Sequence, residues 1–186
     1  MSRFIILCIY LFFLMSTFNV AFAQQASEWQ DISIEGVDNY NRANFQKAAE
    51  KFELALVLAL TSEEGGPRLV NSYLNLALAY EALKRDGESE KLYLEAIRLQ
   101  EKDYGVKDPA LAVMLSRLAG LYTERGEWVM AEPLLRRALS VREDVAGVNH
   151  PYTALAVEEL GNLLFSQERY REAIVQFERA IMIRAN

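Results

Sequence analysis

A repeated pattern of residues constrains the fold of this chain more than any other feature of its sequence. Pro67, Pro109 and Pro151 are evenly spaced, and aligning the chain on them brings other positions into register. The matched columns hold small or bulky apolar residues: Ala77, Ala119 and Gly161; Tyr80, Tyr122 and Leu164; Tyr93, Leu135 and Phe177; Ala96, Ala138 and Ala180. An earlier copy, with a period shorter by one, places Gly36, Phe52 and Ala55 in these columns. A period in the range of about 20–50 residues is typical of a solenoid of stacked supersecondary units.

Each repeat carries the pattern of two helices joined by a short polar turn. In the second copy, apolar residues recur at spacings of three, four and seven, first from Tyr73 to Tyr80 and then from Ser89 to Ile97. Such spacing places them on one face of a helix. Gly105 and Gly147 precede the next repeats and can take a positive φ that ends a helix, and the prolines can open the following one. We therefore expect an all-α domain with units at about residues 28–66, 67–108, 109–150 and 151–186.

The small residues of the pattern have a packing role. Glycine or alanine at one column lets the paired helices approach closely, and a bulky residue of the second helix fills the gap beside it. The expected pairs include Gly36 with Phe52 and Gly161 with Phe177.

One stretch of the third unit resembles a known repeat family. Ala131 to Glu143 (AEPLLRRALSVRE), followed by Gly147 to Pro151 (GVNHP), is similar to the 42-residue tetratricopeptide repeat of the kinesin light chain type. The resemblance covers about residues 28–186 and implies a right-handed solenoid of about four helix–turn–helix pairs that binds other proteins. Two departures are Ser89, where the family usually has alanine, and the first unit, whose Glu35 and Asn39 replace apolar residues.

The resemblance also implies where a partner would bind. In this family the first helices of successive units line a concave groove, and residues beside the core stripe face it. Asparagine offers both a donor and an acceptor to the backbone of an extended peptide, and a glycine leaves room for a ligand side chain. The residues so placed are Asn41, Asn71, Asn75, Leu78, Arg117, Gly120, Glu124, Glu159 and Asn162. A solvated helix face is the alternative for each of them.

Residues 1–23 have the features of a secretory signal. Arg3 precedes the apolar run of residues 4–15, and Ala21 and Ala23 give the small-residue pattern of a cleavage site. We expect cleavage after Ala23, which leaves residues 24–186 as a periplasmic or secreted domain with no membrane attachment. The alternative is an uncleaved anchor, because a run extended to Phe22 becomes long enough to span a bilayer.

Composition excludes several classes of function. The 186 residues include 20 Lys and Arg against 26 Asp and Glu, a net charge of −6 that argues against nucleic acid as a partner. Cys8 and His150 are the sole cysteine and histidine, so we expect no metal, no cofactor and no catalytic residues. His150 stands before Pro151, where a role at a helix entry is favoured over a general base.

The sequence therefore predicts a non-enzymatic, exported scaffold that binds a peptide or protein segment in its groove. The alternative is a small assembly subunit that associates through its last helix. That helix carries Ile174, Phe177 and Ile181, which would mediate a homo-oligomer.

Overall fold

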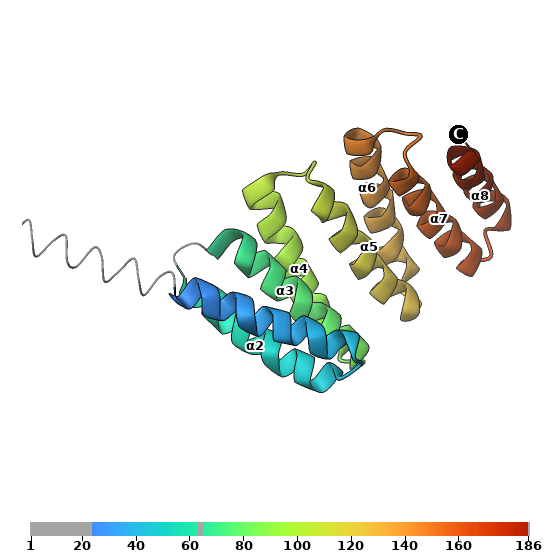
Figure 1. The fold of residues 1–186 in the computed structure, drawn as a ribbon. Helices are drawn as coiled ribbons and strands as arrows, with labels where there is room; N and C mark the ends of the chain where they lie inside the picture. Colours follow the sequence, from blue (N-terminus) through green and yellow to red (C-terminus); the bar gives the residue numbers. More distant parts are fainter. Residues whose placement is uncertain (1–23, 63–64, 186) are drawn as a thin grey trace, which may run out of the picture. The chain divides into compact units, whose positions relative to one another are not determined.

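The computed structural model describes residues 24–62 and 65–185, and the expected signal peptide lies outside these residues. The described residues form helices joined by short turns, with no strand among them (Figure 1). The chain divides into two compact units, Met1–Ala79 and Tyr80–Asn186. The all-α repeat fold expected from the sequence is confirmed.

The first unit contains a helix over residues 24–41, α2 (Phe45–Thr61) and most of α3 (Gly65–Ala82). The indole N–H of Trp29 donates a hydrogen bond of 2.9 Å to the hydroxyl of Ser72, which is buried in α3. The guanidinium of Arg68 lies 5.9 Å from the Trp29 ring. Trp29 therefore holds the first helix against α3.

The second unit contains the end of α3 and five further helices, α4 (Asp86–Tyr104), α5 (Pro109–Glu124), α6 (Trp128–Ala146), α7 (Pro151–Ser166) and α8 (Tyr170–Ala185). Each of these helices packs against the next one in the chain, and α5 also contacts α7. Helices α5 and α6 and helices α7 and α8 are thus two successive helix pairs. The first helices of both pairs lie together.

Local capping fixes where α5 and α7 begin. Each helix has a proline in its first turn, and the residue before it, Asp108 or His150, accepts a hydrogen bond from the backbone N–H two residues on. Its length is 2.8 Å for the Asp108 carboxylate and 3.1 Å for Nδ1 of His150. The predicted role of His150 at a helix entry is confirmed. The preceding helices end at Gly105 and Gly147, whose φ angles are 85° and 96°.

The paired small and large residues pack as the repeat pattern predicts. A Cβ atom added to Gly161 would lie 2.7 Å from Cε1 of Phe177, and one added to Gly36 would lie 2.6 Å from Cδ1 of Phe52. Each glycine thus leaves the space that the ring occupies. Leucines at the core columns, such as Leu118 and Leu160, are almost fully buried. Each contributes about 1.5–3 kcal/mol by leaving water.

Candidate functional site

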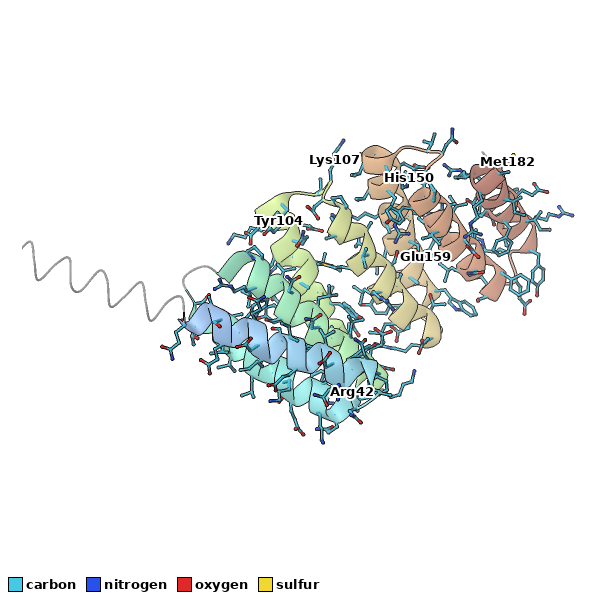
Figure 2. The ribbon with its side chains drawn as sticks, viewed as in Figure 1. Arg42, Tyr104, Lys107, His150, Glu159 and Met182 are labelled. Carbon is cyan, nitrogen blue, oxygen red and sulfur yellow. The ribbon has the colours of Figure 1, made fainter. Side chains whose placement is uncertain are left out.

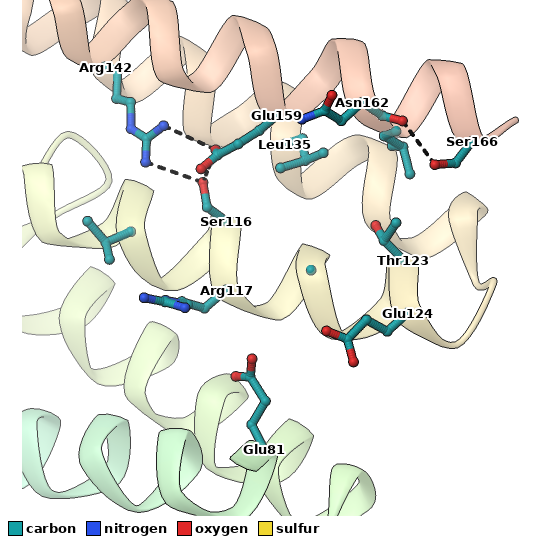
Figure 3. Close-up of a pocket in the computed structure, with 13 residues that line it drawn as sticks. Glu81, Ser116, Arg117, Thr123, Glu124, Leu135, Arg142, Glu159, Asn162 and Ser166 are labelled. Atoms are coloured by element: carbon teal, nitrogen blue, oxygen red, sulfur yellow. Dashed lines mark hydrogen bonds and ion pairs between the residues drawn. The ribbon is translucent and has the colours of Figure 1, made fainter. Parts of the chain in front are cut away.

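A hollow of about 640 Å³ in the second unit lies over the first helices of the last two helix pairs (Figure 3). Most of its lining comes from one face of α5 and one face of α7, with two residues from α6 and one from the end of α3. The lining residues are Glu81, Val113, Ser116, Arg117, Gly120, Thr123, Glu124, Leu135, Arg142, Glu159, Asn162, Leu163 and Ser166. This volume is within the range of about 300–1,000 Å³ that is usual for small-molecule pockets.

Five of the nine residues predicted for a partner-binding groove line this hollow together. Arg117, Gly120 and Glu124 follow one another at spacings of three and four along α5, and Glu159 and Asn162 are three apart on α7. Residues at these spacings share a helix face. The structure thus brings the α5 and α7 members of the prediction to one surface, while their role in binding stays a prediction.

The other four predicted residues belong to the first unit and do not line this hollow. Asn41 and Asn71 are exposed, and Asn75 and Leu78 are partly buried. Asn41 ends the helix over residues 24–41, and the other three lie on α3.

One wall of the hollow is a hydrogen-bonded cluster. The hydroxyl of Ser116 donates to Oε2 of Glu159 at 2.6 Å, and Arg142 donates to the same oxygen at 3.1 Å (Figure 3). Arg142 also reaches Ser116 Oγ at 3.4 Å, and its side chain is only 14% exposed. The carboxylate of Glu159 is therefore neutralised and fixed in place within the protein.

Sequence reasoning missed Arg142 as a wall residue. It lies on α6, the second helix of its pair, and the groove prediction considered first helices alone. The only feature of the sequence that could have indicated this role is a basic residue on α6 that could pair with an acidic residue on α7. That signal does not specify which acidic residue is reached.

Two further carboxylates of the lining also have partners. Glu81 accepts a hydrogen bond of 2.5 Å from the hydroxyl of Tyr93, and Glu124 pairs with Lys84 at 3.0 Å. By contrast, the structure gives no hydrogen bond or ion pair to the side chain of Arg117 or of Asn162 within the described part of the chain. Both are exposed. Arg117 and Asn162 are thus the polar groups of the lining best placed to bind an external ligand.

The wall is open at Gly120, which follows Arg117 by three residues on α5. A Cβ atom added there would meet no atom within 4 Å. The missing side chain therefore leaves free space above α5, and a ligand side chain could enter it without displacing the protein.

The turns within the helix pairs hold a second kind of charged cluster, which reaches back to the preceding repeat. Arg125 pairs with Glu90 at 2.6 Å and with Glu127 at 2.6 Å, and the hydroxyl of Tyr122 donates to Glu90 at 2.9 Å. Burial raises the pKa of Glu90, but hydrogen bonds from Arg125 and Tyr122 outweigh it, so the net pKa is lowered. Burial and the bond to Glu90 raise the pKa of Tyr122 to about 12.

The cluster recurs one repeat further along the chain. Glu132 pairs with Arg136 at 2.6 Å and with Arg169 at 2.7 Å, and Arg169 also pairs with Glu172. Burial raises the pKa of Glu132, but its arginine partners lower it overall. Because the same arrangement ties successive helices at both places, we interpret it as a structural link between repeats.

The described residues hold neither a cluster of metal ligands nor a membrane-spanning helix. Among them, no three His, Cys, Asp or Glu side chains gather closely enough to hold a metal ion. None of the helices that the structure describes has both the length and the apolar composition needed to cross a membrane.

The last helix exposes much of its apolar surface. Ile174 and Ile181, two of the three residues predicted for self-association, are 54% and 65% exposed. Phe177, the third, is half-buried and packs against Gly161 on α7, so it supports the helix pair. Figure 2 labels Met182 on this helix, and it too is exposed.

Comparison with known families identifies the repeats. Residues 69–110 and residues 110–186 each match a family model described as tetratricopeptide repeat. A curated relative, human "Tetratricopeptide repeat protein 19, mitochondrial", is 22% identical over 163 residues, which cover 84% of this chain. These residues span 41% of that protein, so the chain covers less than half of its length.

Solved structures show the same fold. BtubC (BKLC) from P. vanneervenii aligns with a TM-score of 0.77 at 21% identity, covering 89% of this chain and 72% of that one. A Podospora anserina protein described as having kinesin light chain TPR-like repeats aligns with a TM-score of 0.75 at 22% identity, covering 86% and 76% of the two chains. The resemblance to kinesin light chain repeats is confirmed at the level of the fold.

Proposed function

Because this chain is a tetratricopeptide repeat protein over residues 69–186, we propose that it is an exported, non-catalytic scaffold that binds a peptide or protein segment over α5 and α7. Repeats of this family generally mediate protein–protein interactions, which supports a binding role. The observation that carries the proposal is a pair of exposed side chains, Arg117 and Asn162, that have no polar partner in the described part of the chain and line the same hollow as the open space at Gly120.

The chemistry of the lining favours an extended segment. The amide of Asn162 can both donate to and accept from one peptide unit of a ligand. The guanidinium of Arg117 can bind a carbonyl or a carboxylate, and charge-assisted bonds of that kind contribute about 1.5–3 kcal/mol. Since Glu159 is already neutralised by Arg142, it does not repel an acidic group near Arg117.

A crosslinked pull-down from the native cell-envelope extract tests this proposal. The chain, expressed with its own N-terminus, is compared with the double variant Arg117→Ala/Asn162→Ala. We expect the variant to lose a partner that the unaltered protein retains. Lys102→Ala/Asn149→Ala is the control, because it likewise removes one cation and one amide from exposed sites outside the hollow. Equal recovery by all three proteins would overturn the groove as the binding site.

Export rests on the N-terminal sequence. Residues 4–15 form an apolar run after a single arginine, Arg3. A mitochondrial transit peptide is instead amphipathic and rich in arginine, so the "mitochondrial" in the human relative's name does not transfer to this chain. Intact mass of the protein recovered from the periplasm or medium tests the proposal, and we expect a chain that begins at Gln24. A full-length chain recovered with the membranes would favour the uncleaved anchor.

A second candidate function is an assembly subunit that associates through α8. The exposure of Ile174 and Ile181 supports it.

A further inference from the structure

The exposed face of α8 carries a stripe of apolar residues. Tyr170, Ile174, Val175, Ile181 and Met182 are each at least half exposed. At 100° per residue they fall within about 140° of the helix circumference. The opposite face, which includes Ala173, Ala180 and Ile183, is buried in the repeat.

The charges of α8 divide into two groups according to their place on the helix. Beside the stripe, Glu172 pairs with Arg169, Arg179 with Glu143 and Arg184 with Glu158. Within the stripe, the structure gives neither Arg171 nor Glu178 a hydrogen bond or ion pair in the described part of the chain. Both are exposed.

These two opposite charges cannot satisfy each other within one helix. Side chains pair along a helix at spacings of three or four residues, and Arg171 and Glu178 are seven apart. At a rise of 1.5 Å per residue, each lies about 5 Å from the midpoint between Ile174 and Val175. The stripe therefore has an apolar centre with one positive and one negative group placed symmetrically around it.

We propose that α8 docks on α8 of a second copy of this chain, antiparallel, about a two-fold axis opposite Ile174 and Val175. An isologous contact places residue i against j and j against i. Arg171 of each copy then faces Glu178 of the other, so the contact contains two ion pairs. Ile174 packs on Val175 at the axis, and Ile181 reaches the second copy's Tyr170. This inference gives the second candidate function its partner and is independent of the groove.

Charge reversal in the full-length chain tests the pairing by sedimentation velocity. R171E makes the four central groups all acidic, and E178R makes them all basic. We expect each variant alone to dissociate at least tenfold more readily than the unaltered protein. An equimolar mixture of R171E and E178R should recover a dimer, because both contacts then join opposite charges.

Further variants distinguish a loss of the α8 contact from a loss of folding and from a loss of binding in the groove. Ile174→Asp should give a monomer with an unchanged circular dichroism spectrum. Arg117→Ala/Asn162→Ala should leave the dimer intact, so a failed groove and a failed dimer give different results. A monomeric unaltered protein at high micromolar concentration would overturn the proposal. So would a dimer that R171E and E178R leave unchanged, or two variants that do not associate when mixed.

Discussion

Gly161 shows how closely single residues of this chain are matched to one another. A methyl group there would lie 2.7 Å from one ring atom of Phe177, 3.0 Å from a second and 3.3 Å from Cβ of Gln176. In the preceding repeat the same columns hold Ala119 and Leu135, both buried. The two repeats therefore fill the same position with different pairs of side chains. The smaller Gly161 faces the larger Phe177, and the larger Ala119 faces the smaller Leu135.

We expect Gly161→Ala to destabilise the protein by about 1 kcal/mol. Overpacking costs about 1–3 kcal/mol, which outweighs the gain in helix propensity of about 1 kcal/mol. Thermal unfolding measures the change. Adding Phe177→Leu reproduces the pairing of the preceding repeat and should recover most of the lost stability.

Gly120→Ala is the matched control for this change. It is also a mid-helix glycine, but its new methyl group would meet nothing within 4 Å. It should therefore raise stability by about 0.5–1 kcal/mol. A loss of stability at Gly120 as large as that at Gly161 would contradict the packing argument.

At the scale of the helix pair, one turn position recurs in every repeat with a left-handed backbone. Ala43, Lys84, Gly126 and Glu168 have φ angles between 59° and 73°. They follow one another at the period of the repeat and so occupy the same turn of successive repeats. This conformation costs a non-glycine residue about 1–2 kcal/mol, so three of the four turns carry a cost that Gly126 avoids.

We expect Gly126→Ala to destabilise the protein by about 1 kcal/mol and Ala43→Gly to stabilise it by up to about 1 kcal/mol. Neither change removes a polar group, and Ala43 is exposed, so both report chiefly on the backbone. Chemical denaturation of the two variants gives the comparison. A shift of the midpoint in the same direction for both substitutions would contradict a backbone cost at this turn.

At the scale of the whole molecule, recurring ion-pair clusters between helices make stability depend on pH. The pKa values of Glu90 and Glu132 are lowered in the folded protein, below the ordinary value of 4.5. In the unfolded chain these groups take up protons near pH 4.5, while in the folded protein they stay charged to lower pH. Their contribution is therefore full above about pH 4.5 and is lost as the pH falls through the folded pKa.

We expect Glu132→Gln to lower the melting temperature at pH 7 by a few degrees and to flatten its decline at acidic pH, below the ordinary carboxylate pKa. Glu28→Gln is the control, because Glu28 is exposed and has no ion pair among the described residues. Melting curves between about pH 3 and pH 7 make the comparison. Parallel curves for Glu132→Gln and the unaltered protein would contradict the assignment.

The alkaline limit follows from the same clusters. Tyr122 has its pKa raised to about 12 from 10.0, so the unfolded chain loses this proton first. Stability should fall as the pH rises from about 10 towards 12, and Tyr122→Phe should reduce that fall. Melting curves across this range measure the difference.

The sequence by itself determined the repeat, the helix pairs and their ends. These features depend on interactions within one repeat. They are the apolar spacing of three and four residues, the proline in the first turn of a helix, and the small residue that faces a large one. The same period placed Arg117, Gly120 and Asn162 on facing helix surfaces, since each helix presents its residues at a fixed angle.

Only the tertiary structure decided which of those groups are free. Arg142 neutralises Glu159 from α6, and Tyr93 binds Glu81 from α4. These contacts join side chains of different helices. They therefore depend on side-chain rotamers and on helix packing, which the repeat period does not encode. Arg117 and Asn162 became the candidate binding groups because packing satisfied their neighbours and left these two exposed.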